Sequence, residues 1–248
     1  MGFSPWERNN EYRKNMAVIM GQKAQLWWDL PAMDGFLLLK EIYQIPKKDF
    51  YESVEYLSEY LDVKDQLNIQ IRRLSLGERM KVELMAALLH KPKIVFLDEP
   101  TIGLDLTAQK AVRSFIKNYR KEFNSTMILT SHYMDDIEEL CPRVAILKEG
   151  KKIYDGELAT LHEKYAHERL IVANINNNQD LTTLINTFPS KLGKVESFDK
   201  QIRITTPREN VMDASKYLLN HCKITDLSIK EEEIGDVIEK ILRRREPK

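Results

Sequence analysis

The feature that most constrains the fold is the segment from Arg72 to Asp105, which reads RRLSLGERMKVELMAALLHKPKIVFLDEPTIGLD. Ser75, followed three residues later by Glu78, has the capping-box spacing that opens a helix, and Pro92 marks the end of that helix. The continuous apolar run over residues 93–98 is typical of a strand buried on both faces of a parallel sheet. The segment therefore predicts a helix followed by a central strand.

Further strands and helices alternate along the same part of the chain. Short apolar runs predict two more strands, over residues 15–20 and 126–131, whereas the polar residues 1–14 are predicted to form a loop. The alternation predicts an α/β domain with a largely parallel sheet. Its other predicted elements are a β-hairpin over residues 143–156, with its two strands joined at Gly150, and helices over residues 33–45, 47–63, 75–90, 106–123 and 133–141.

The pattern changes after about residue 166. From Arg169 to Arg244 the order of predicted elements is βαββαβ followed by a further helix, which is the ferredoxin-like pattern. Strands are predicted over residues 169–175, 193–198, 201–206 and 223–229, and helices over residues 179–188, 208–221 and 231–244. We therefore expect a first domain over residues 1–165 and a small α+β domain over residues 166–248.

Composition excludes several classes of protein. The 38 Lys and Arg residues balance 38 Asp and Glu residues, so binding to nucleic acid through bulk charge is not expected. Cys141 and Cys222 are far apart and match no metal spacing, which suits a reducing cytosol. The sequence shows no apolar run long enough to span a bilayer and no signal peptide.

Polar side chains with phosphate and metal chemistry follow the predicted strands. Asp98 and Glu99 end the central strand, where ligands bind in open α/β sheets. Asp98 offers the oxygen ligand that Mg²⁺ prefers, and Glu99 is placed to orient a water molecule that attacks a γ-phosphate. Gln22 and His132 follow the neighbouring strands and would reach the same edge. Taken singly, each also fits a structural role, as a solvated turn or an ordinary surface residue.

The start of the predicted helix at Ser75 allows two interpretations. Ser75 and Glu78 fit a capping box that serves the helix alone. With Gly77 beside them, the same bare N–H groups and the positive end of the helix dipole suit a phosphate group.

In their order along the chain, these motifs resemble the ATP-binding cassette (ABC) family. The resemblance runs from residue 17 to about residue 156 and places the Q-loop at Gln22, the signature at Leu74–Glu78, Walker B at Ile94–Glu99, the D-loop at Gly103–Asp105 and the switch histidine at His132. The signature departs from LSGGQ, because Leu76 replaces the first glycine and Glu78 replaces the glutamine.

The resemblance implies a P-loop NTPase-like fold with ATP and Mg²⁺ as ligands. It assigns catalysis to Glu99 and His132. It assigns the metal to Asp98 and Gln22, and nucleotide contacts to Gln22, Ser75, Gly77, Glu78 and Asp105.

The segment GQKAQLWWDLP, residues 21–31, resembles the Q-loop region of ATPases that serve ABC-2-type exporters, which commonly carry a ferredoxin-like extension. The resemblance implies two partners, a membrane-embedded permease subunit and a second ABC ATPase domain in a homodimer or heterodimer, and a cytoplasmic location at the inner face of the membrane. Trp27 and Trp28 would face the permease, or else pack in the core.

One part of the family pattern is absent from the sequence. None of the nine glycines belongs to a G-x-x-x-x-G-K phosphate loop, the Walker A motif. That loop, the adenine platform and the first strands of the family would precede Gln22, so we expect an incomplete domain with a core face and a strand edge exposed. A phosphate loop supplies several N–H donors and a lysine, so this chain alone is expected to bind ATP poorly.

Three functions remain to be compared. The first is an ABC exporter ATPase subunit that is incomplete at its N-terminus. The second is a non-hydrolysing interaction or regulatory fragment that pairs with an intact ATPase. The third, a soluble ABC ATPase of translation or DNA repair, is disfavoured because the sequence has neither a second cassette nor long coiled coils.

Overall fold

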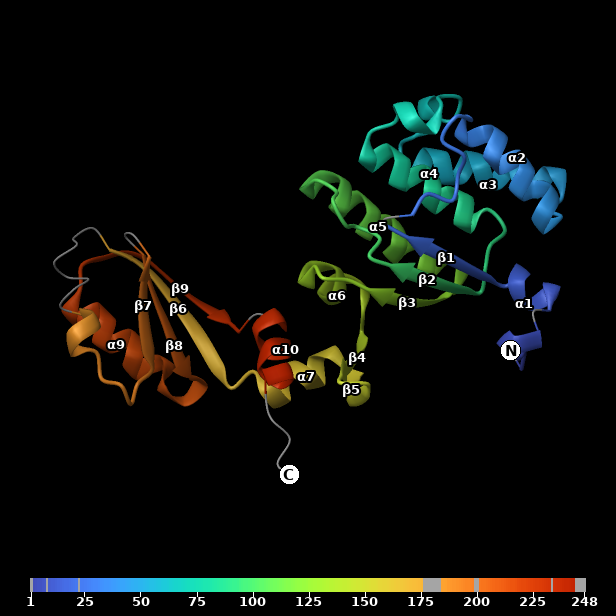
Figure 1. Cartoon of the computed structure of the whole chain (residues 1–248). Helices are drawn as coiled ribbons and strands as arrows, with labels where there is room; N and C mark the ends of the chain where they lie inside the picture. The colour runs from blue at the N-terminus through green and yellow to red at the C-terminus, as the bar shows by residue number, and fades with distance from the viewer. Residues whose placement is uncertain are drawn as a thin grey trace. The chain divides into compact units, whose positions relative to one another are not determined.

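The computed structural model describes residues 2–7, 9–21, 23–175, 184–198, 201–232 and 234–243. The chain divides into two compact units, Met1–Cys141 and Pro142–Lys248. In Figure 1 the first unit runs from blue to green and the second from yellow to red. The boundary that we expected after residue 165 falls inside the second unit.

The first unit is an α/β unit whose elements follow the predicted order. The helix predicted over residues 106–123 has those bounds in the structure, and the helix predicted from Ser75 begins at Leu76 with Ser75 as its cap. The elements are 3₁₀ turns at Pro5–Glu7, Lys64–Gln66 and Ile71–Arg73, helices α1 (Asn10–Lys14), α2 (Ala32–Tyr43), α3 (Lys47–Tyr60), α4 (Leu76–Leu88), α5 (Leu106–Phe123) and α6 (Met134–Leu140), and strands β1 (Met16–Met20), β2 (Ile94–Asp98) and β3 (Thr126–Thr130).

The three strands form a parallel sheet in the order β1-β2-β3. This confirms the three predicted strands and the adjacent, parallel pairing of the last two. The register places Val18 opposite Phe96, and Phe96 opposite Ile128. Because the strands are parallel, their carboxyl ends meet at one edge of the sheet (Figure 1).

The sheet is covered on one face only, among the residues that the structure describes. Val95 and Leu97 of β2 are buried against the helices, whereas Val18 is 39% exposed and Ile128 is 52% exposed on the opposite face. Phe96 of β2 lies on that opposite face and is only partly buried, so the prediction that β2 is buried on both faces is wrong. The expectation of an exposed core face is confirmed. This arrangement is unusual, because parallel sheets are ordinarily covered on both faces.

The N-terminal segment differs from the predicted loop. It contains a 3₁₀ turn at Pro5–Glu7 and the short helix α1. Asn9 caps this helix, because its side-chain oxygen accepts a hydrogen bond from the Glu11 N–H at 2.8 Å. Asn9, Asn10 and Glu11 have the composition of a polar linker, although Asn followed by Glu is also the start of a capped helix.

The second unit begins with the predicted hairpin, formed by β4 (Arg143–Lys148) and β5 (Lys151–Glu157). Its two turn residues, Glu149 and Gly150, have φ of 50° and 76°, as a tight primed turn requires. Helix α7 (Leu158–Tyr165) follows, and α10 (Ile234–Arg243) packs beside it, with Val237 and Ile241 in one core with Leu161 of α7. This shared core explains why the unit begins at Pro142 rather than after residue 165.

The rest of the second unit is a four-stranded antiparallel sheet in the order β7-β8-β6-β9. Its strands are β6 (Glu168–Ile175), β7 (Lys194–Phe198), β8 (Gln201–Pro207) and β9 (Ile224–Glu231), and a 3₁₀ turn at Arg208–Asn210 leads into α9 (Val211–His221). Of the helix predicted over residues 179–188, residues 179–183 lie outside the described residues and residues 184–187 are helical. The predicted βαββαβ order is present, although β9 extends to Glu231 and delays the start of the last helix.

Within the described part of the chain, no helix combines the length and the apolar character that crossing a membrane requires.

Candidate functional site

The candidate site lies where β2 ends between its two neighbours. The register aligns Asp98 with Met20 on one side and Thr130 on the other. The Thr130 hydroxyl donates to Asp98 Oδ1 at 2.6 Å, and the Gly21 N–H donates to the Asp98 carbonyl oxygen at 2.9 Å. The Asp98 carboxylate is exposed and oriented, which suits an oxygen ligand of a hard cation.

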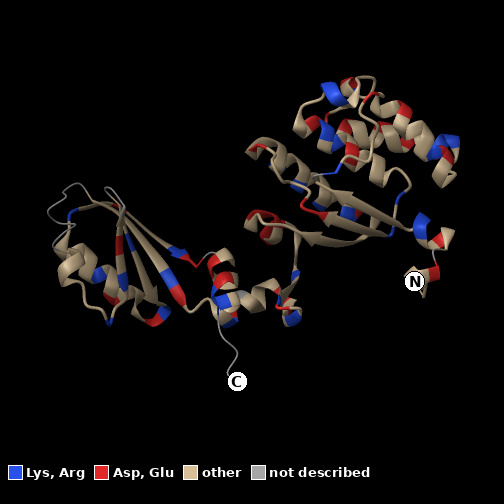
Figure 2. Cartoon of the chain, in the orientation of Figure 1, with Lys and Arg blue, Asp and Glu red and all other residues tan. Residues whose placement is uncertain are grey.

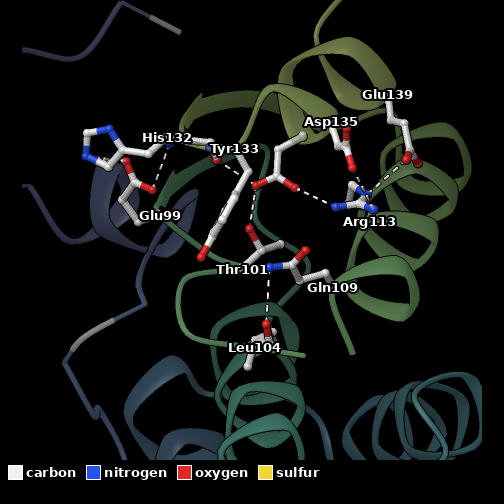
Figure 3. Close-up of polar contacts among 11 residues, drawn as sticks. Glu99, Thr101, Leu104, Gln109, Arg113, His132, Tyr133, Asp135 and Glu139 are labelled. Atoms are coloured by element: carbon white, nitrogen blue, oxygen red, sulfur yellow. Dashed lines mark hydrogen bonds and ion pairs between the residues drawn. The ribbon is translucent and has the colours of Figure 1, made fainter. Parts of the chain in front are cut away.

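Glu99 and His132 are brought together at this edge. The backbone N–H of His132 donates to Glu99 Oε2 at 3.0 Å, and His132 Nε2 lies 3.4 Å from Glu99 Oε1 (Figure 3). The Glu99 side chain is only 18% exposed, whereas that of His132 is 87% exposed. The glutamate is therefore held by the histidine segment, and the imidazole is free to meet a ligand from solvent.

The backbone of Glu99 is in the left-handed region, with φ of 52°. This conformation is uncommon for a residue with a side chain, and such strain is concentrated at functional sites. Two hydrogen bonds hold it: the Glu99 N–H donates to the Thr130 carbonyl oxygen at 3.0 Å, and the Glu99 carbonyl oxygen accepts from the Ile102 N–H at 3.2 Å.

Gly21 lies in close contact with the same turn. A Cβ atom built on Gly21 would be 2.0 Å from the Glu99 carbonyl oxygen, which is closer than any real side chain comes. A glycine at this position is thus required by the approach of two backbones.

Gln22, which follows Gly21, was predicted to contact the metal and the nucleotide. It lies outside the described residues. Its predicted role is not tested by the structure.

The described residues include no cluster of three or more His, Cys, Asp or Glu side chains that could hold a metal ion. A Mg²⁺ ion bound with a nucleotide uses one or two carboxylates, and its other ligands are phosphate oxygens and water. The single oriented carboxylate of Asp98 fits that kind of site.

The signature residues form a second group at the start of α4. Ser75 and Glu78 make a full capping box: Ser75 Oγ accepts from the Glu78 N–H at 3.3 Å, and Glu78 Oε2 accepts from the Ser75 N–H at 2.9 Å. Hydrogen bonds from the Ser75 side chain and backbone lower the pKa of the Glu78 carboxyl, so it remains an anion. The capping role is therefore established by the geometry, and a nucleotide role would come in addition to it.

The predicted D-loop lies against this helix start. A Cβ on Gly103, which has φ of 73°, would meet Leu76 at 3.2 Å, and a Cβ on Gly77 would meet Ala108 at 3.3 Å. Asp105 caps α5, because its Oδ1 accepts from the Ala108 N–H at 2.8 Å. The residues of the predicted signature and of the predicted D-loop therefore pack against each other. They form a second group, distinct from the Asp98, Glu99 and His132 side chains at the end of β2.

Trp27 and Trp28 are each 51% exposed, so the alternative that they pack in the core is wrong. The loop that carries them is fixed from inside the protein. The buried carboxylate of Glu83 accepts hydrogen bonds from the backbone N–H groups of Gln25 and Leu26 at 3.0–3.2 Å, and its burial raises its pKa. A fixed loop that presents two half-exposed indole rings is suited to a protein contact.

Sequence reasoning missed a buried polar network beside Glu99 and His132. Arg113 and Asp136 are 1% and 0% exposed, and the guanidinium lies 3.1 Å from Asp136 Oδ1. Asp136 Oδ2 accepts hydrogen bonds from the hydroxyls of Thr101 and Ser131. One signal was available: Arg113 occupies a core-facing position of the amphipathic helix α5, and a buried charge there requires a partner.

Comparison with known proteins agrees with these motifs. A family model described as ABC transporter matches residues 4–102. The chain is 30% identical over 169 residues to the ABC transporter ATP-binding protein NatA of Bacillus subtilis, covering 68% of this chain and 68% of that protein. It is 32% identical over 142 residues to an ABC transporter ATP-binding protein of Methanocaldococcus jannaschii, covering 57% of this chain and 54% of that protein.

Among solved structures, one titled as the ATP binding subunit of an ABC transporter superposes with a TM-score of 0.59 at 21% identity. The match covers 66% of this chain and 68% of that one, and it supports the fold. From the relatives and the matched motifs together, the chain belongs to the family of ABC transporter ATP-binding proteins.

Proposed function

We propose that this chain provides ATP-hydrolysing machinery to an ABC-2-type export system. The observation that carries the proposal is the pairing of Glu99 with His132 at the carboxyl edge of a parallel sheet, beside the oriented carboxylate of Asp98. The strained backbone at Glu99 and the exposed histidine held next to it support a catalytic role, because such strain is concentrated at functional sites.

Each side chain of this group has a distinct task in phosphoryl transfer. Asp98 would ligate Mg²⁺ directly or through water, and Mg²⁺ would neutralise charge on the phosphate oxygens. Glu99 would orient the water molecule that attacks the γ-phosphate. His132, exposed at the same edge, would contact the γ-phosphate itself. Such groups act only on a nucleotide that is already held in place.

The residues that hold the nucleotide cannot all come from this sequence, because it contains no G-x-x-x-x-G-K loop. In support of a role for the predicted signature, Ser75, Gly77 and Glu78 lie together at the start of α4, and Asp105 caps α5. This group is suited to close over ATP bound to a second ABC ATPase domain, in a homodimer or a heterodimer. The alternative of a non-hydrolysing interaction fragment is not favoured, because the matched relatives are named ATP-binding proteins.

The second proposed partner is a membrane-embedded permease subunit. Trp27 and Trp28 present apolar rings on a loop that Glu83 fixes, and this surface would receive a helix of the permease. The GQKAQLWWDLP segment and the α+β fold of residues 166–248, which we treat as an accessory domain, support assignment to the ABC-2 type. The chain would then work in the cytoplasm, peripheral to the inner face of the membrane.

Nucleic acid is not among the proposed partners. Figure 2 shows Lys and Arg interleaved with Asp and Glu along the helices of the first unit and along the helices and strands of the second. With a formal net charge of zero, such a mixture does not favour attraction to the phosphate backbone of a nucleic acid. It also does not favour the release of counterions that drives nucleic-acid binding.

The experiment that tests the function is a gain of activity. A strand and a G-x-x-x-x-G-K-[ST] loop of the phosphate-loop pattern would be joined ahead of residue 16 to make a chimera. We expect the chimera to bind ATP and hydrolyse it in the presence of Mg²⁺, measured as phosphate release. A well-folded chimera that binds ATP but releases no phosphate would contradict the assignment of Glu99 and His132 to catalysis.

A further inference from the structure

We infer that Asp136 is a positioning residue, which sets the location of His132 relative to Glu99 through a buried network. This inference rests on the proposed function, which assigns His132 and Glu99 to catalysis. The contacts that position the two residues lie within this chain and can be tested without nucleotide.

The carboxylate of Asp136 joins the two segments that carry the proposed catalytic pair. The Thr101 hydroxyl, two residues after Glu99, donates to Asp136 Oδ2 at 2.5 Å. The Ser131 hydroxyl, one residue before His132, donates to the same oxygen at 2.6 Å. One buried atom therefore fixes the distance between the turn of Glu99 and the segment of His132.

The same network reaches the residue on the other side of His132. The N–H of Tyr133 donates to Ser131 Oγ at 3.0 Å, so the Ser131 hydroxyl accepts from Tyr133 while it donates to Asp136. His132 is thus held between two residues that are both tied to Asp136. Its own N–H and ring project toward Glu99 and not into the network, as Figure 3 shows for the labelled pair.

Arg113 is the ion-pair partner of Asp136 within this network. Both side chains are buried, and the guanidinium lies 3.1 Å from Asp136 Oδ1. Two further carboxylates of α6 face the guanidinium: Glu139 Oε1 is 3.0 Å from Nε in an ion pair, and Asp135 Oδ2 is 3.8 Å away (Figure 3). A buried ion pair is a weak source of stability compared with apolar packing. Here the buried pair instead specifies a single geometry for the four segments that carry Thr101, Arg113, Ser131 and Asp136.

The network also explains how the strained backbone of Glu99 persists. A left-handed residue is retained only where its surroundings over-determine it. Thr101 fixes the chain after Glu99, and the His132 N–H fixes the Glu99 carboxylate. Loosening Asp136 would release both constraints together.

The test is amide hydrogen exchange, followed by NMR on the whole chain. The reporter is the His132 N–H, whose acceptor, Glu99, is not altered by any of the substitutions. In Asp136→Asn the carboxylate loses its charge beside Arg113, and we expect exchange at His132 to become about tenfold faster or more, relative to amides of β2. Ser131→Ala leaves the ion pair between Arg113 and Asp136 intact. In this variant we expect the same acceleration of exchange at the His132 N–H, with exchange of the β2 amides unchanged.

Asp135→Asn is the matched control. It makes the same change on the neighbouring residue of α6, whose side chain is 70% exposed, and we expect His132 exchange to stay as in the unaltered chain. If Asp136→Asn does not fold, Ser131→Ala decides the outcome. A His132 amide that keeps its protection in Ser131→Ala, or that changes only in step with β2, would overturn the proposal.

Discussion

Replacing Glu99 with Gln in the chimera that carries a phosphate loop is expected to slow ATP hydrolysis by roughly 10²–10⁴-fold, the usual effect of removing a general base or water-orienting group. The amide has nearly the same shape and retains an oxygen that can accept from the His132 N–H, so the turn is expected to survive. ATP binding is expected to persist, because the role proposed for Glu99 is to orient the attacking water and not to hold the nucleotide. The measurement is steady-state phosphate release, with ATP binding measured in parallel.

Glu138→Gln provides the control for this change, since Glu138 is an exposed glutamate on α6. We expect it to leave the rate unaltered. His132→Ala is expected to reduce turnover as Glu99→Gln does, by removing the proposed contact with the γ-phosphate. Undiminished hydrolysis in Glu99→Gln would mean that another group orients the water and that the carboxyl edge of β2 is not the reaction centre.

Replacing Gly21 with Ala is expected to destabilise the first unit by roughly 3 kcal/mol, toward the upper end of the range for an over-packed site. The added Cβ would lie 2.0 Å from the Glu99 carbonyl oxygen and 2.8 Å from the Ile102 side chain. Ile102 can move, but the carbonyl belongs to a backbone held by hydrogen bonds on both sides. The strained turn and β1 must therefore separate.

Urea unfolding followed by tryptophan fluorescence measures this effect. The chain has three tryptophans, and all lie within residues 6–28, so the signal reports on the first unit. Gly77→Ala is the matched control: its Cβ would meet only a side chain, at 3.3 Å, and alanine is a better helix former by about 1 kcal/mol. A midpoint for Gly21→Ala equal to that of the unaltered chain would show that the two backbones are not in enforced contact.

The elements that could be predicted from the sequence are those with local signals. The capping box at Ser75 and Glu78 fixed the start of α4, and the paired turn residues at Gly150 fixed the hairpin. The placement of Glu99 beside His132 followed from strand order alone, because the ends of adjacent parallel strands meet. Each of these depends on few residues that are close in the sequence or on one topological rule.

What could not be predicted depends on packing between distant segments. The apolar run of β2 has the composition of a strand buried on both faces, and nothing local shows that one face lacks a cover. The left-handed backbone at Glu99 is imposed by Gly21, Thr130 and Ile102, and glutamate has no preference for it. Asp136 is one of four acidic residues in α6, and only the fold distinguishes it as the partner of Arg113.

On the function proposed above, this chain carries reaction groups for ATP but has no G-x-x-x-x-G-K loop to hold the phosphates. The most direct test is to titrate the purified 248-residue chain with a fluorescent ATP analogue and Mg²⁺, and to follow phosphate release. We expect weak binding that does not saturate and phosphate release at background. Tight binding, followed by steady phosphate release that Glu99→Gln removes, would contradict the claim.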